Sequence, residues 1–325
     1  MVMDPGVGFG KGGDQNCQGG PEVRIDIECY STIRSNRRQG QTVLAGPPAA
    51  LGESFPVLAR ISMIATVALV AVSLPVRPAA GQGPAHTAPR TVDGKPDLSG
   101  IWQALNTANW DIQDHSVAPG PVATLGAVGA VPPGMGVVEG DEIPYLPAAA
   151  KKKQENFANR FTADPEIKCY LPGVPRATYM PQPFQVIQGA KSIMIAYQYA
   201  GAVRTIPMED PGPSPAPSWM GWSVGHWDGN TLVVDVTGFN DQTWFDRAGN
   251  FHSDALHVVE RYTPRTPDIL MYEATIEDPK VFARPWKMSM PLYRRVEKNA
   301  QLLEFRCVEF SEEIIYGHLR KKASK

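Results

Sequence analysis

The sequence has few of the features that mark nucleic-acid-binding, membrane-spanning and cofactor-binding proteins. Its 31 Lys and Arg nearly balance its 33 Asp and Glu, and no basic tract is long enough to neutralise many phosphates, so nucleic acid is not an expected partner. No apolar run reaches the roughly 20 residues of a transmembrane helix, so no stable membrane span is expected in the mature chain. No cofactor is expected from the sequence.

Glycine and proline are abundant instead. The 325 residues include 30 Gly and 31 Pro, which is high for a helical protein and ordinary for short strands joined by many turns. With 43% hydrophobic residues, the chain can build a real core. The composition thus predicts an all-β protein of one large or two small domains.

The first 81 residues are expected to lie outside the folded domain. Residues 1–55 are polar, rich in Gly and without periodicity, which predicts a disordered extension or a start codon assigned too far upstream. Residues 56–81 match a secretory signal peptide, because Arg60 precedes an apolar run (61–74) and small residues lead to Gly81. We therefore expect a periplasmic or secreted protein. The alternative is an uncleaved membrane anchor or a buried apolar helix.

Cleavage after Gly81 would leave one pair of cysteines in the mature chain, Cys169 and Cys307. In an exported protein, two thiols most simply form a disulfide. The alternative is a pair of buried free thiols, because sequence alone does not show whether their Cα atoms come within bonding reach.

Residues 82–183 are predicted to hold a lead-in strand, a long loop and one helix. Residues 98–104 are strand-like, whereas residues 117–147 consist mainly of Pro, Gly, Ala and Val without a sustained period. An irregular stretch of this length usually forms a flap over a site or is mobile. Residues 147–160 begin with Pro and continue with strong helix formers, which predicts a helix with a solvated charged face.

Residues 184–325 follow a period of two, which is typical of antiparallel strands. The expected strands are 184–188, 192–199, 202–208, 222–227, 231–237, 256–262, 269–276, 286–293 and 302–307. Asp228 and Gly229, between two of these strands, suit a hairpin turn. Strands at this spacing without intervening helices predict a mainly antiparallel, lipocalin-like barrel or a strongly bent meander, with residues 98–308 as one folded unit.

Two features resemble the calycin superfamily, which includes the lipocalins. Gly100-Ile101-Trp102 lies on the first expected strand and Arg306 on the last. In calycins, the Trp of a Gly-x-Trp motif packs beside an Arg near the end of the barrel. The resemblance therefore implies that the Arg306 guanidinium stacks on Trp102. The insertion from Asn106 to Pro183 has no calycin counterpart.

A second resemblance covers Pro96 to Val308. The segments PDLSGIW (96–102), WDGNTLVVD (227–235), GFND (238–241) and HSDALHV (252–258) are similar to those of a group of exported bacterial proteins of unknown function. This resemblance implies a shared fold and export, and it assigns no activity.

Ionisable residues are concentrated between positions 246 and 261, which predicts a site there. His252, Asp254, His257 and Glu260 have the chemistry of general acid and base catalysis. On a strand, His257 and Glu260 point to opposite faces, so His252 with Asp254 is the favoured pair. We expect His252, Asp254 and His257 to converge on one concave surface. One alternative is that the acidic residues form turns and the histidines bond to the backbone. Another is that these side chains hold a metal, although their spacing is not a recognised metal signature.

Aromatic residues crowd the same region. The predicted ligand-binding residues are Trp222, Trp227, Trp244, Asp246, Arg247 and Arg261. Aromatic clusters line small-molecule pockets and equally fill barrel cores. The sequence thus predicts a protein that binds a small, largely apolar molecule. One alternative is a periplasmic hydrolase or lyase that uses a His/Asp pair in the same pocket, and another is a structural protein of the cell envelope. The sequence does not specify the ligand or substrate, the oligomeric state or the metal content, and it does not decide whether the protein is an enzyme.

Overall fold

The computed structural model describes residues 89–120 and 122–319, which belong to the compact unit Ala79–Lys325. The expected extension (1–55) and signal peptide (56–81) lie outside the described residues. In the described ranges, no helix has the length and apolarity that crossing a membrane takes.

Strands dominate the described unit, as the composition predicts. The strands are β1 (Gly100–Ala104), β2 (Asp114–His115), β3 (Gly134–Met135), β4 (Phe184–Gln188), β5 (Ser192–Tyr197), β6 (Val203–Pro207), β7 (Trp222–Asp228), β8 (Thr231–Thr237), β9 (His257–Thr266), β10 (Ile269–Glu277) and β11 (Trp286–Arg294). The α-helices are α1 (Pro147–Ala158), α2 (Arg160–Ala163) and α3 (Ser311–Tyr316). Short 3-10 helices occupy Ala123–Gly129, Glu139–Asp141, Pro165–Lys168, Arg176–Tyr179, Tyr199–Gly201 and Gly317–Leu319.

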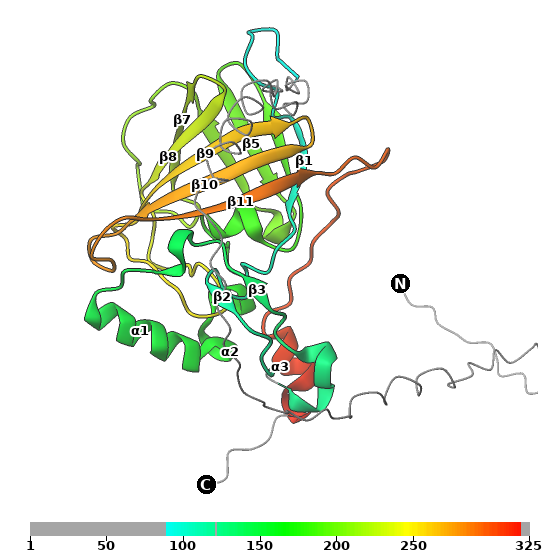
Figure 1. Cartoon of the computed structure of the whole chain (residues 1–325), viewed down its shortest axis with the longest axis vertical. Coiled ribbons are helices and arrows are strands. Elements are labelled where there is room, and N and C mark those ends of the chain that lie inside the picture. The colour runs from blue at the N-terminus through cyan, green and yellow to red at the C-terminus, as the bar shows by residue number, and fades with distance from the viewer. Residues whose placement is uncertain (1–88, 121, 320–325) are drawn as a thin grey trace, which may run out of the picture. The chain divides into compact units, whose positions relative to one another are not determined.

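Nine strands form one antiparallel sheet that curls into a nearly closed barrel (Figure 1). The strand order is β6-β5-β4-β1-β11-β10-β9-β8-β7, so β1 joins two meanders by pairing with both β4 and β11. The two edges, β6 and β7, approach each other without a hydrogen-bonded ladder. A methyl group on Gly225 of β7 would come within 2.7 Å of Ile206 Cγ2 on β6, so glycine permits this close approach. The predicted all-β antiparallel barrel is confirmed.

Period-two alternation predicted the strands well, with one error. The expected strands 184–188 and 231–237 coincide with β4 and β8. The expected strand 302–307 is wrong, because this segment is irregular and Leu303 is 62% exposed. The segment has no free edge of β11 to pair with, because β11 already pairs with β10 on one side and with β1 on the other.

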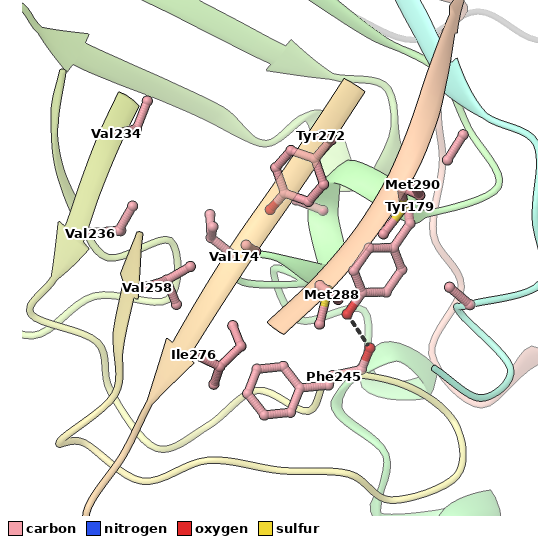
Figure 2. Close-up of a cluster of buried hydrophobic side chains, with 14 of the residues drawn as sticks. Val174, Tyr179, Val234, Val236, Phe245, Val258, Tyr272, Ile276, Met288 and Met290 are labelled. Carbon is pink, nitrogen blue, oxygen red and sulfur yellow. Dashed lines mark hydrogen bonds between the residues drawn. The ribbon is translucent and has the colours of Figure 1, made fainter. Parts of the chain in front are cut away.

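A buried segment, residues 172–180, enters the barrel end nearest α1 and fills it. Every residue of this segment is buried, including the 3-10 helix Arg176–Tyr179. Figure 2 shows side chains from β8 to β11, such as Val234 and Met288, gathered around Val174 and Tyr179 of this segment. The Tyr179 hydroxyl donates a 2.8 Å hydrogen bond to the Phe245 carbonyl. The barrel interior is therefore packed with the protein's own side chains.

An ion pair is buried inside the barrel. Glu260 of β9 accepts a 2.5 Å bond from Arg204 of β6, and both side chains are at most 2% exposed. The hydroxyls of Tyr262 and Tyr272 each donate a 2.9 Å bond to the other carboxylate oxygen. These partners satisfy both oxygens of a carboxylate that would otherwise be costly to bury.

An arginine side chain of β11 stacks on a tryptophan ring of β1, the strand with which β11 pairs. The guanidinium carbon of Arg294, on β11, lies 4.3 Å from the ring centroid of Trp102, on β1. A side chain at Gly100 would overlap this guanidinium, which explains the glycine two residues before Trp102. The prediction that Arg306 makes this contact is wrong, because Arg306 is 85% exposed and pairs with Glu304, whereas Trp102 is buried. Arg294 takes the place because it lies on the strand that pairs with β1.

The insertion between β1 and β4 builds a layer below the barrel. Figure 1 shows α1, α2, β2 and β3 gathered there with α3 from the C-terminal segment. The predicted disulfide is confirmed, since Cys169 and Cys307 are bonded with Cα atoms 5.7 Å apart. It ties the C-terminal segment to the end of the 3-10 helix Pro165–Lys168. This layer carries the candidate site.

Candidate functional site

A cavity of about 200 Å³ lies in the layer below the barrel, and we call it the basal cavity. Its walls come from the β1–β4 insertion, from α1 and α2, from the loop 244–251 and from α3. The lining residues are Trp110, Asp111, His115, Ser116, Ala118, Pro119, Val131, Phe157, Arg160, Phe161, Asp164, Ile167, Arg247, Ala248 and Glu312. It combines apolar walls with a few polar groups, as small-molecule sites do.

The walls of the basal cavity are mainly aromatic and aliphatic. Trp110 follows β1 on the insertion, and Phe157 and Phe161 lie on α1 and α2. Phe157 is 46% exposed although it is large and apolar, and α1 has few buried positions of its own. The helix therefore presents an aromatic ring to the cavity rather than to the core.

Arg160 lies at the boundary of α1 and α2 with its guanidinium held between two rings. The guanidinium carbon is 4.0 Å from the Phe157 centroid and 4.2 Å from the Phe161 centroid. One of its nitrogens donates a 2.6 Å bond to the Phe157 carbonyl. Partial burial lowers the pKa of Arg160. In the described part of the chain, no carboxylate lies within ion-pair distance of this cation.

Asp111 and His115 are titratable groups of the cavity that form no ion pair with another described residue. His115 Nδ1 lies 2.8 Å from the Gln113 carbonyl oxygen, which can only accept, so Nδ1 carries the proton. In the neutral ring, Nε2 is then an acceptor, and this buried atom has no hydrogen-bond partner among the described residues. Burial is the main factor that raises the pKa of Asp111, and the Gln113 N–H, which donates to this carboxylate, opposes it.

A buried network of ion pairs forms the floor of the cavity. Arg247 pairs with Glu166 at 2.8 Å and with Glu312 of α3 at 3.0 Å, and its guanidinium carbon lies 4.6 Å from the Trp110 centroid. Behind it, Arg176 pairs with Glu166 at 2.6 Å and with Asp164 at 3.0 Å. These pairs fix the side chains, and each of the two guanidinium groups is shared by two of the three carboxylates.

Asp246 was predicted to bind ligand, and the structure places it behind the cavity wall. It is fully buried and accepts bonds from the Ile112, Ala248 and Asn250 backbone N–H groups and from the Asn250 amide. Burial and, next, the Asp111 carboxylate raise the pKa of Asp246 to about 7, against these donors. Asp246 thus connects the loop 244–251 to the chain beside Asp111.

The structure does not bring the four predicted catalytic residues together. His252 is buried, with Nε2 2.5 Å from the Thr243 hydroxyl. Asp254 is exposed and pairs with Lys280 at 2.6 Å. His257 lies on the outer face of the barrel beside Asp235 and Glu277, whereas Glu260 points into the interior. The expectation that His252, Asp254 and His257 converge is therefore wrong, and the expectation that His257 and Glu260 face opposite sides of β9 is confirmed.

The predicted aromatic residues are likewise dispersed. Trp222 donates to the Gly212 carbonyl, Trp227 packs against the core, and Trp244 is 9% exposed in the loop that precedes β9. Arg261 pairs with Asp228 on the outer face of the barrel. Of the ten residues predicted for catalysis or ligand binding, Arg247 is the one that lines the basal cavity.

The buried His252 predicts an acid-sensitive contribution to stability. Burial lowers the pKa of His252, so the folded protein keeps the ring neutral where the unfolded chain takes up a proton. The unfolded state then binds more protons, and stability is lost as the pH falls below the ordinary histidine value of about 6.5. The raised pKa of Asp246 changes stability in the opposite direction over the same range, so the test is a difference between two proteins. In urea unfolding between pH 7.5 and 5, the wild type should lose stability relative to the His252→Gln variant. Equal pH dependence of stability in both proteins would contradict a lowered pKa of His252 in the folded state.

Two other hollows are less suited to a ligand. A cavity of about 170 Å³ lies under the C-terminal segment, near Phe305 and Cys307, and shares Arg247 with the basal cavity. A shallow hollow of about 490 Å³ beside residues 295–303 is lined mainly by exposed polar side chains. Among the described residues, no group of three or more His, Cys, Asp or Glu side chains is placed to hold a metal ion.

Sequence reasoning missed Trp110, Asp111, His115 and Arg160 as site residues. The available signal was the long irregular stretch 117–147, for which a flap over a site was one of two interpretations. Ala118, Pro119 and Val131 of that stretch do line the basal cavity. Comparisons with family models, with curated proteins and with solved structures find no match to this chain.

Proposed function

We propose that this protein binds a small, largely apolar molecule in the basal cavity. The observation that carries the proposal is the combination of Trp110, Phe157 and Phe161 on the walls with Asp111 and Arg160, which have no ion-pair partner among the described residues. Apolar walls supply affinity, and a few oriented polar groups supply specificity. The dense barrel interior also favours a site outside the barrel, in contrast to the interior site of a lipocalin.

Export to the periplasm or the cell exterior is part of the proposal. The bond between Cys169 and Cys307 supports it, because disulfides persist mainly in oxidising compartments. We also propose a distant relation to the calycins. The contact between Trp102 on β1 and Arg294 on β11 supports this relation, with a different arginine from the one that the sequence suggested.

A hydrolase or lyase is the second candidate. It is supported by His115 and Asp111, which line one cavity and could act as base and acid, rather than by His252 and Asp254. Turnover of an ester panel that is lost in a His115→Gln variant would favour the enzyme. Binding without turnover would favour the first candidate.

The binding proposal is tested by filling the cavity. Ala118 is exposed and lines it, so Ala118→Trp should occupy the space without disturbing the core. Aromatic and medium-chain aliphatic acids and amides should raise the unfolding temperature of the wild type. A ligand at a hundred times its Kd adds about 2.7 kcal/mol to stability. Ala118→Trp should lose this response, and Ala216→Trp, in the exposed loop between β6 and β7, should keep it.

Two results would overturn the proposal. One is a wild type that no member of the panel stabilises. The other is an Ala118→Trp variant that responds as the wild type does.

A further inference from the structure

The cations at the basal cavity differ in whether their charge is already neutralised. Arg247 is paired with both Glu166 and Glu312, and Arg176 behind it with Asp164 and Glu166. Arg160 lines the same cavity, and no carboxylate of the described chain pairs with it. Its charge is therefore available to a ligand.

The Arg160 guanidinium is also held in place and partly withdrawn from water. The Phe157 and Phe161 rings lie 4.0 and 4.2 Å from it, and its bond to the Phe157 carbonyl uses one of five N–H donors. Partial burial also lowers the pKa of Arg160, in keeping with a cation partly withdrawn from water. A planar guanidinium fixed in this way matches a carboxylate, to which it can donate two parallel bonds.

The other charges around the cavity limit the ligand to a single negative charge. Asp111, Asp164 and Glu312 line the same space, so a phosphate or another dianion would meet three carboxyl groups. A cationic ligand would meet Arg160. The remaining walls, with Trp110, Val131 and Ile167, suit an apolar body.

We propose that the ligand of the basal cavity is a small apolar monocarboxylate, and that Arg160 binds its carboxylate while the aromatic walls hold the rest. This inference rests on the proposed binding function and adds the chemical class of the ligand. A hydrogen-bonded charge pair that replaces a neutral contact should favour the acid over its amide by at least about tenfold in Kd.

Isothermal titration of the full chain with phenylacetate and octanoate, against phenylacetamide and octanamide, tests the inference. Each acid should bind the wild type at least about tenfold more tightly than its amide. In Arg160→Gln the two should bind within about twofold of each other, with amide binding unchanged, and Arg160→Lys should keep part of the preference. Arg284→Gln, which removes an arginine paired with Glu142 outside the cavity, should behave as the wild type.

The outcomes separate the two proposals. If acids and amides bind the wild type equally, or if Arg160→Gln keeps the preference, the inference fails and binding in the cavity stands. If neither acids nor amides bind, the proposed function fails and the inference fails with it.

Discussion

Replacing Cys169 and Cys307 together by serine is expected to lower the free energy of unfolding by up to about 5 kcal/mol. The bridge spans 138 positions and encloses β4 to β11, so it removes much of the conformational freedom of the unfolded chain. It also holds the C-terminal segment, whose Glu312 pairs with Arg247 at the cavity floor. Urea unfolding of the wild type and of the double variant measures the difference.

Reduction provides the control for the disulfide prediction. The wild type in reductant should unfold like the double variant, and the double variant itself should not respond to reductant. A loss of less than about 1 kcal/mol in the double variant would contradict a stabilising bridge, because chain entropy alone predicts several times more.

Replacing Glu260 by glutamine is expected to cost about 3 to 5 kcal/mol, the usual effect of leaving one member of a buried ion pair without its partner. The substitution keeps the size of the side chain and removes the charge that faces Arg204 at 2.5 Å inside the barrel. Tyr262 and Tyr272 also lose a charged acceptor, and bonds to charged groups are the stronger ones. Chemical denaturation gives the change directly.

The next residue on the same strand offers a matched control. Arg261 points outward from β9 and forms an exposed pair with Asp228, so Arg261→Gln should change stability by no more than about 1 kcal/mol. Replacing Arg204 and Glu260 together by Met and Leu should recover only part of the loss, because no buried charge is then left but the Tyr262 and Tyr272 hydroxyls lose their acceptor. A Glu260→Gln variant as stable as the Arg261→Gln variant would contradict the account of the interior.

The fold could be predicted from the sequence because the strands carry their own signal. Alternation along 231–237 distinguishes an inner and an outer face, and the bounds of β8 follow from it. The same rule separated His257 from Glu260 on β9. The rule failed at 302–307, where strand-like residues had no edge left to pair with, and it could not tell Arg294 from Arg306 as the partner of Trp102.

The candidate site could not be predicted in the same way because its residues share no period. The charges between 246 and 261 cluster in sequence and then separate in space. Glu260 goes to the interior, His257 to the outer surface and Asp246 to the support of a loop. Trp110, Asp111 and Arg160 come together only because the β1–β4 insertion folds back below the barrel, and tertiary packing decides that arrangement.

The indole N–H signals of the seven tryptophans in a two-dimensional ¹H–¹⁵N spectrum test the central claim most directly. Trp110 lines the basal cavity, whereas Trp222 and Trp227 lie on β7 of the barrel. Titration with phenylacetate should shift the Trp110 signal, assigned from a Trp110→Phe variant, and leave the signals of Trp222 and Trp227 in place. Shifts at Trp222 or Trp227 with an unchanged Trp110 would contradict the account and place the ligand at the tryptophans predicted from the sequence.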